Sequence, residues 1–534
     1  MNSDGIAYLD LADAYLRGGW TTLINGHWSP LYPWLLAIAM RVVRPSSYWE
    51  FTVAHLLNLA IYVVALISFE YMMRQLVTQS QRDRLGNTWT SLPRWSLLVI
   101  GYLLFGWSSL SLITMEQMSP DVLMSIFVLL ATALILRIRQ GLGDWLCFFS
   151  LGMVLGLGYL AKAPMFPLAF VFLGVALFAQ GNLKKANLRK AVLLACLAFF
   201  VFLSVSGPFI TALSLKKGRF TFGESAKLNY LWVINKAGPH WYSQDAGTAG
   251  GKFLHPPKKI FDFPPVYEFS DFVGGTQPVW YDPSYWIEGA TPRLDLKKQL
   301  LVLIKNSGIY FELLFSSEAA LLTVAIVLMC FAGPRPSLRG IAAQWPILIP
   351  SLAALLMYAV VLVETRYVAV FLAILWIALF SGIRLPVARD SSKLAAGVTL
   401  AIAVVLGAPL AQSSLYDINQ GLRHHGHPQW EVAENLRYLG IHPGDRVARI
   451  GGQYAANWAR LLRVRVVAEV PRDKAGDFWS ATPAVQAQIL DRLRRIGVTA
   501  VVAQQFPPNE VFAPGPEWKR MGNTDFYAFT WSRD

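Results

Sequence analysis

Acidic and basic side chains stand where apolar segments end, at four places in the sequence. Asp4 precedes an N-terminal helix that carries Asp10 and Asp13, and Lys162 separates two apolar runs. Polar groups at the ends of membrane spans usually mark a site, because burying them idly costs several kcal/mol. Carboxylates and cations on one face suit a reaction in which a base removes a proton and a cation steadies a phosphate leaving group. The full set is Asp4, Glu116 with Asp121, Lys162, and Glu364 with Arg366.

Each of these residues also has a purely structural explanation, and the joint pattern is stronger evidence than any single member. Asp10 and Asp13 could form the solvated face of a helix. Lys162 could extend to the membrane interface. The remaining alternatives are a helix cap for Glu116 or Asp121 and a structural ion pair for Glu364 with Arg366.

The composition indicates that a lipid bilayer is the main solvent of this chain. Of its 534 residues, 54% are hydrophobic and only 15% are charged, and the mean hydropathy is +0.41. The net charge of +14 comes from basic residues in short loops, where they set orientation rather than bind nucleic acid. The three cysteines lie inside apolar runs with no disulfide or metal spacing, so redox chemistry is not expected.

Apolar segments long enough, or nearly long enough, to cross about 30 Å of hydrocarbon recur along the chain. They predict a polytopic α-helical membrane protein with about ten spans. Two segments meet at Lys162-Ala163-Pro164, where the pair forms either two spans or one broken hairpin. The segments cover residues 48–74, 95–115, 120–137, 145–161, 164–180, 191–213, 309–332, 343–363, 367–383 and 394–412.

The basic residues give these spans an orientation. Arg and Lys concentrate in alternate loops, which predicts that those loops face the cytoplasm. The opposite, extracytoplasmic side then receives residues 1–46, the long loop 214–308 and the soluble domain 413–534. We therefore expect an inner-membrane protein whose transmembrane domain covers residues 1–412, with its site and its soluble domain outside the cytoplasm.

The N-terminal region is predicted to be the remainder of an extracytoplasmic loop. It begins with polar residues, so we expect a first spanning helix to be missing; the alternative is that this short stretch crosses unaided. Residues 3–18 have helical spacing and predict a surface helix, and 31–43 predict a re-entrant or juxtamembrane helix. The 214–308 loop is rich in Pro, Gly, Trp and Tyr, which predicts a cover that orders against a surface without its own core.

After the last predicted span, helices and strands alternate, which predicts a small α/β domain. The Gly451-Gly452 pair follows a predicted strand, but without a full glycine-rich motif it supports nucleotide binding only weakly. His424, His425 and His427 lack a carboxylate at ligand spacing, so an exposed linker is favoured over a metal site. Strands are predicted at 446–450, 464–470 and 498–503, and helices at 430–439 and 482–496.

Several loose motifs, in the same order and on the same predicted side, resemble those of GT-C glycosyltransferases. These multispanning enzymes depend on polyprenyl-phosphate sugars and include protein O-mannosyltransferases, aminoarabinose transferases of lipid A and rhizobial lipopolysaccharide galacturonosyltransferases. The resemblance covers roughly residues 1–385 and not the C-terminal domain. The motifs are Asp4-Gly5-x-x-Tyr8, Trp28-Ser29-Pro30-Leu31-Tyr32-Pro33, Ser119-Pro120-Asp121, Gly158-Tyr159-Leu160-Ala161-Lys162 and Glu364-Thr365-Arg366-Tyr367.

The resemblance implies catalytic roles for acidic residues. Asp4 matches the family's base in the first loop, and either Asp121 or Glu116 matches a second acidic residue at the next extracytoplasmic turn. The family's paired acidic motif is absent, since Gly5 follows Asp4, and the first helix that we expect to be missing would be a second departure. The sequence does not reveal whether a divalent metal takes part, so a divalent metal is possible.

The resemblance also implies an activity, the inverting transfer of a hexosyl or pentosyl group from a polyprenyl-phosphate donor to an extracytoplasmic lipid, glycan or protein. The alternative is a transporter or lipid flippase, which would usually show repeated halves and charges at mid-membrane. Another alternative is a non-catalytic membrane protein that recruits partners through its C-terminal domain. The implied substrate-binding residues are Tyr8, Lys162, Glu364, Arg366 and Tyr367.

Overall fold

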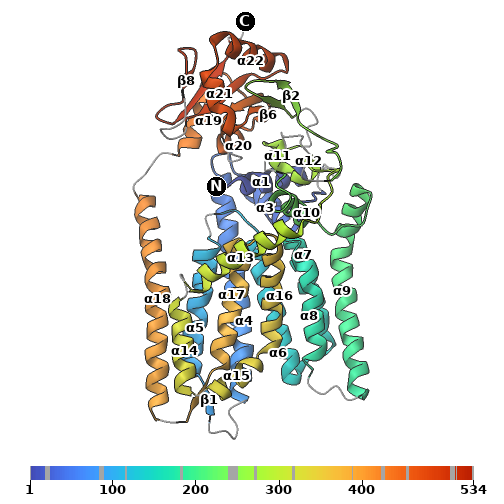
Figure 1. Cartoon of the computed structure of the whole chain (residues 1–534), viewed down its shortest axis with the longest axis vertical. Coiled ribbons are helices and arrows are strands. Elements are labelled where there is room, and N and C mark those ends of the chain that lie inside the picture. The colour runs from blue at the N-terminus through green and yellow to red at the C-terminus, as the bar shows by residue number, and fades with distance from the viewer. Residues whose placement is uncertain are drawn as a thin grey trace.

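The computed structural model shows a bundle of long helices with an α/β domain at one end (Figure 1). Helices α1 (Ser3–Arg17) and α3 (Leu31–Val43), with parts of the 214–308 loop, lie between the bundle and this domain. The structure describes residues 2–18, 24–82, 89–114, 117–180, 185–237, 250–269, 274–315, 319–332, 334–387, 389–422, 427–452, 456–505, 512 and 514–531.

The bundle is that of a multi-pass membrane protein. Within the described residues, six helices are long and apolar enough to span, or up to eight if each of two bent helix pairs is one span. The six are α4 (Glu50–Arg82), α5 (Arg94–Gly106) with its π-helical continuation Trp107–Leu112, α6 (Asp121–Arg137) continued by Ile138–Leu142, α9 (Lys185–Lys217), α17 (Thr365–Gly382) and α18 (Arg389–Leu422). The bent pairs are α13 (Leu296–Phe315) with α14 (Ala319–Ala332), at 69°, and α15 (Pro334–Ala342) with α16 (Trp345–Val361), at 74°.

Two of the predicted spans are shorter helices, α7 (Trp145–Ala161) and α8 (Met165–Phe178), which meet at Lys162. At 1.5 Å per residue they reach roughly 25 and 20 Å, less than a full hydrocarbon thickness. The turn between them brings Lys162 to the end of the bundle where the other charged residues gather.

Helix α7 packs closely on α9 through small residues. A Cβ atom on Gly152 would lie 2.3 Å from the Ala198 carbonyl oxygen, and one on Gly156 would lie 2.5 Å from Val205 Cβ. Glycines four residues apart on one face let two helix backbones approach, the common packing device of membrane helices. This contact fixes α7, and with it the position of the turn at its end.

Helix α1 is buried along most of its length, which differs from the predicted surface helix. It begins at an N-cap, Asn2, whose side chain accepts a hydrogen bond from Gly5 N, and it ends at Gly18 in the left-handed conformation. It contacts α3, α11 (Pro278–Tyr281) and α20 (Asn457–Leu462), so the loop and the C-terminal domain cover the face predicted to meet solvent.

The C-terminal domain is a small α/β unit, as its alternating pattern predicts. Its three parallel strands, β6-β5-β7, occupy the centre of a seven-stranded sheet of order β2-β3-β6-β5-β7-β9-β8. The strands are β5 (Arg446–Ile450), β6 (Arg465–Val470), β7 (Ala500–Gln504), β8 (Lys519–Arg520) and β9 (Phe526–Thr530). The helices are α19 (Pro428–Tyr438), α20, a short 3-10 turn Arg472–Lys474, α21 (Ala475–Ser480) and α22 (Pro483–Arg495).

The long loop supplies the remaining two strands of that sheet. β2 (Lys258–Phe261) and β3 (Val266–Glu268) form a hairpin, and β3 pairs antiparallel with β6. The loop also has a small apolar core that includes Leu231 and Trp286, contrary to the expectation that it forms none. The loop is therefore joined to the C-terminal domain through the pairing of β3 with β6. Its helices are α10 (Ser225–Val233), α11 and α12 (Pro283–Trp286).

The other end of the bundle carries α15 and a two-stranded sheet of β1 (Trp89–Ser91) and β4 (Arg384–Pro386) (Figure 1). These elements contain Arg335, Arg339 and Arg384, three of the basic residues that predict a cytoplasmic side. The described basic residues of α15 and β4 thus lie at the end of the bundle opposite the α/β domain.

Candidate active site

A cavity of about 560 Å³ lies at the bundle end that faces α1 and the long loop. Its walls come from α1, α8, α10 and α16 and from the ends of α6, α7 and α17. Its volume is within the usual range for small-molecule sites, roughly 300–1,000 Å³. Among the described residues that line it, those with a formal charge are Asp4, Asp121, Lys162 and Arg366.

Arg366 holds the two carboxylates in one cluster. Its Nη2 lies 3.1 Å from Asp4 Oδ2, and its Nη1 lies 3.8 Å from Asp121 Oδ2. Lys162 Nζ donates a hydrogen bond to Asp121 Oδ1. Two carboxylates face two cations, which offsets the cost of burying each charge.

Helix ends position all four side chains. Asp4 lies in the first turn of α1, and Asp121 begins α6 directly after Pro120. Lys162 is the C-cap of α7, so three of the four charges have the sign that the helix dipole favours, worth roughly 0.3–1 kcal/mol each. The positive charge of Arg366, in the first turn of α17, is opposite to the sign that the helix dipole favours there. Its two carboxylate neighbours compensate for this unfavourable position.

Aromatic rings pack against the cations and the acids. Lys162 Nζ lies 3.6 Å from the centroid of the Tyr367 ring, a cation–π contact. Tyr8 lines the cavity and packs edge-on against Trp28 and Tyr32. Burial, with the charges of Asp4 and Asp121, raises the pKa of Tyr8 well above its usual value, so its hydroxyl stays protonated and able to donate.

A tight turn after α1 fixes the next part of the wall. Asn25 Oδ1 accepts hydrogen bonds from the backbone nitrogens of His27 (2.8 Å) and Trp28 (2.9 Å). Asn25 Nδ2 donates to the Tyr281 carbonyl at 2.7 Å, which ties the turn to the long loop. The neighbouring Trp280 donates from its indole Nε1 to Asp4 Oδ1 at 3.1 Å. The long loop therefore helps to orient the carboxylate of Asp4.

His27 and Trp280 are cavity residues that the sequence reasoning did not select. Burial, together with the nearby Lys162 ammonium, lowers the pKa of His27 to about 3, so the ring is neutral at physiological pH. Its Nδ1 is buried and has no hydrogen-bond partner among the described residues. His27 adjoins the Trp28-to-Pro33 motif, the one sequence signal that could have identified it.

The remaining selected residues lie elsewhere or are not described. Tyr367 lines the cavity, whereas Glu364 is the exposed N-cap residue of α17 and does not line it. Glu116 is outside the described residues, as are His424 and His425. Asp121, one of the two acidic residues that the motif order leaves open, lines the cavity.

Asp10 and Asp13 belong to a second charged cluster, away from the cavity lining and not on a solvated face. Arg460 Nη1 lies 2.7 Å from Asp10 Oδ1 and 2.7 Å from Asp13 Oδ2, and Arg460 Nε lies 3.1 Å from Glu50 Oε2. Asp10 also accepts hydrogen bonds from Thr276 N and Oγ1. Burial opposes the charge on Arg460, but the three carboxylates outweigh it and raise its pKa. This cluster joins α1, α4, the long loop and the C-terminal domain.

Metal-ligand geometry is absent from the part of the chain that the structure describes. No group of three or more His, Cys, Asp or Glu side chains there could hold a metal ion.

No protein-family model and no curated protein sequence matches the chain. Among solved structures, it is similar to ArnT from Cupriavidus metallidurans bound to undecaprenyl phosphate, with a TM-score of 0.40, 12% identity, and coverage of 99% of this chain and 93% of that one. It is also similar to the Archaeoglobus fulgidus oligosaccharyltransferase in a complex with Zn and sulfate, with a TM-score of 0.48 and 12% identity over 94% of this chain. The chain spans 64% of that protein's length. At this level of similarity, function has to be inferred from the cavity itself.

Proposed function

We propose that the chain is an integral membrane glycosyltransferase that transfers a sugar from a polyprenyl-phosphate donor to an acceptor outside the cytoplasm. The observation that carries this proposal is the cavity in which Asp4, Asp121, Lys162 and Arg366 meet. A carboxylate that can accept a proton lies there beside two cations that can hold a phosphate. Both functions are needed for glycosyl transfer from a lipid phosphate.

The cations suit the phosphate of the donor. A guanidinium and an ammonium aimed at developing negative charge stabilise a phosphate leaving group, and such contacts are stronger in a water-poor site. Arg366 can also bind phosphate oxygens through two parallel hydrogen bonds.

The apolar part of the cavity suits the lipid. The last turn of α16 contributes Met357, Val360 and Val361, and Pro167 comes from α8. These side chains lie in helices of the membrane bundle, next to the charged cluster. A polyprenyl chain can therefore reach the site from the bilayer while its phosphate meets Lys162 and Arg366.

Asp4 is the base that we propose. One of its oxygens accepts from Trp280 Nε1 and the other from Arg366, which fixes the carboxylate without filling all its lone pairs. Asp121 contacts both cations and is more deeply buried than Asp4, so we assign it the role of holding Lys162 and Arg366 in place.

The acceptor oxygen attacks the anomeric carbon from the side opposite the phosphate, and Asp4 takes the acceptor proton. The bond from the anomeric carbon to the phosphate oxygen breaks, and its electron pair stays on the lipid phosphate beside Lys162 and Arg366. The configuration at the anomeric carbon is inverted. The products are the glycosylated acceptor and the polyprenyl phosphate, and Asp4 later releases its proton to water.

The test is Asp4→Asn, which keeps the side-chain size but removes the base. Membranes containing the protein are assayed with a panel of polyprenyl-phosphate hexoses and pentoses. We expect Asp4→Asn to abolish transfer while the protein still elutes as a folded species, and Glu364→Gln, an exposed acid-to-amide change, to retain it. Transfer by Asp4→Asn at the wild-type rate would exclude this role for Asp4.

A further inference from the structure

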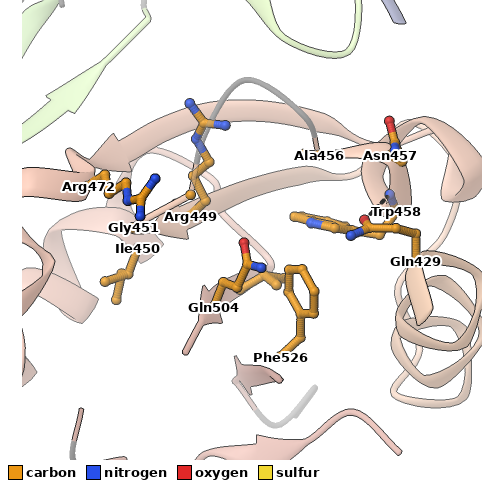
Figure 2. Close-up of a pocket in the computed structure, with 12 residues that line it drawn as sticks. Gln429, Arg449, Ile450, Gly451, Ala456, Asn457, Trp458, Arg472, Gln504 and Phe526 are labelled. Carbon is orange, nitrogen blue, oxygen red and sulfur yellow. Dashed lines mark hydrogen bonds between the residues drawn. The ribbon is translucent and has the colours of Figure 1, made fainter. Parts of the chain in front are cut away.

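The C-terminal domain contains a second cavity, of about 260 Å³, that transfer at the first site does not use. It lies where the parallel strands end, between Ile450 at the end of β5, Gln504 at the end of β7, and Arg472 just after β6. Figure 2 shows Arg449 and Arg472 on one side of it, Trp458 and Gln429 on the other, and Gln504 with Phe526 between them.

The topology makes this end of the sheet a binding position. α20, which follows β5, packs on one face of the sheet with Val447 and Val466. α22, which precedes β7, packs on the other face with Ala448 and Val467. In an open α/β sheet, the crevice at the carboxyl ends of the strands, where the connections diverge to opposite faces, is the usual ligand site.

The side chains of the cavity indicate the charge of the ligand. Arg449 and Arg472 contribute to its lining, and none of the described residues that line it is Asp or Glu. Arg449 is held by Glu469, whose Oε2 accepts from Arg449 Nε at 2.5 Å. Two guanidinium groups therefore contribute to the lining of the cavity, and guanidinium groups bind carboxylate and phosphate oxygens well.

The uncharged lining indicates a polyhydroxylated ligand. Gln429, Asn457 and Gln504 can each donate and accept hydrogen bonds, as hydroxyl groups require. Trp458 and Phe526 offer apolar ring surface to the carbon atoms of a sugar. The volume is just below the usual range for small-molecule sites, roughly 300–1,000 Å³, and suits one sugar unit rather than a dinucleotide.

The Gly451-Gly452 pair explains how the backbone reaches this cavity. Both glycines line it, and both have positive φ, 69° and 102°, which side-chain-bearing residues rarely adopt. They let the chain turn sharply after β5 and leave backbone exposed to the cavity. The helix that follows, α20, has only six residues, so side chains rather than a helix terminus must hold the ligand.

We propose that this cavity binds a sugar residue that carries a carboxylate or phosphate group. The binding is independent of the transfer reaction, so it can be measured even if the proposed function fails.

The experiment is isothermal titration calorimetry of the full chain in detergent with glucuronate, glucose 6-phosphate, glucose and inorganic phosphate. We expect the two acidic sugars to bind and to compete with each other, and glucose and inorganic phosphate to bind at least about tenfold more weakly, because each lacks one half of the recognised chemistry. Inorganic phosphate or glucose that binds as tightly as the acidic sugars would overturn the proposal. So would no measurable binding of either acidic sugar.

Variants locate the binding. Arg472→Gln and Gln504→Leu should each weaken the acidic sugars by about tenfold. Arg495→Gln removes the same charge as Arg472→Gln, but from the exposed end of α22, and should have no effect. Arg366→Gln in the first cavity should also have none. Loss of binding in Arg366→Gln, or retention in both Arg472→Gln and Gln504→Leu, would place the sugar elsewhere and overturn the proposal.

Discussion

Arg460 Nη1 lies 2.7 Å from Asp10 Oδ1 and so joins the C-terminal domain to the helix that carries Asp4. Asp10 and Asp4 share helix α1, and Asp10 also accepts two hydrogen bonds from Thr276 of the long loop. The soluble domain, the loop and the helix of the proposed base therefore meet in one charged cluster, to which Arg463 also contributes by pairing with Asp13 and Glu50.

Replacing Arg460 with Met should destabilise the protein strongly. Removal of the cation leaves Asp10, Asp13 and Glu50 with fewer partners in a buried position, a loss of about 3–5 kcal/mol. Thermal unfolding in detergent measures the effect. Arg495→Gln, which breaks an exposed pair with Asp491, should cost about 0–1 kcal/mol. Equal unfolding midpoints for Arg460→Met and the wild type would show that the cluster does not hold the domain.

Replacing Arg366 with Gln should slow transfer far more than it weakens folding. The guanidinium is proposed to hold charge that develops on the phosphate, and removal of such a group costs about 10²–10³ in kcat. Steady-state rates with a lipid-phosphate sugar measure this. Lys298→Gln, which removes an exposed charge paired with Asp295, should leave kcat unchanged. A rise in KM alone for Arg366→Gln would indicate ground-state binding only.

His27 should make the protein sensitive to acid. Its pKa is about 3 in the folded protein and about 6.5 when unfolded, so the unfolded chain binds the proton first. His27 thus costs stability as the pH falls from about 6.5 towards 3, by about 2 kcal/mol at pH 5. Unfolding midpoints at pH 8 and pH 5 should differ less in His27→Gln than in the wild type. An equal difference in both proteins would contradict the lowered pKa.

Gly26 should not tolerate a side chain. A Cβ atom there would lie 2.5 Å from Ser284 Oγ and 2.9 Å from Glu224 Cγ, too close for van der Waals contact. Gly26→Ala should displace the His27–Trp28 wall of the cavity and reduce transfer, and Gly174→Ala, where a Cβ atom meets nothing within 4 Å, should not. Activity and unfolding are measured together. Wild-type behaviour of Gly26→Ala would mean that the turn can shift without effect.

The sequence was most informative where one residue type dominates a long segment. Apolar runs identified the membrane bundle, and alternating patterns identified β5, β6 and β7, because each of these signals is local. The common sidedness of Asp4, Asp121, Lys162 and Arg366 followed from counting spans, and the structure brings these four side chains into one cavity. Their roles remain predictions.

Features that depend on distant partners were not predictable. The pattern of α1 suggested a solvated face for Asp10 and Asp13, but their partner, Arg460, is hundreds of residues away in the sequence. Trp280 reaches Asp4 only because the long loop folds back over the bundle. The strands β2 and β3 have four and three residues, too few for a periodic signal, and only their pairing with β6 reveals them.

The pairing of β3 with β6 also constrains how the protein is made. The β2–β3 hairpin leaves the ribosome before α13 to α18, whereas β6 is synthesised only after them. Until then the free edge of β3 has no strand partner and is exposed to adventitious pairing. The helices between them must also be inserted so that β6 emerges on the same side of the membrane as β3. Completion of this sheet thus depends on correct membrane insertion, because a chain with one helix misinserted would have β3 and β6 on opposite sides of the membrane.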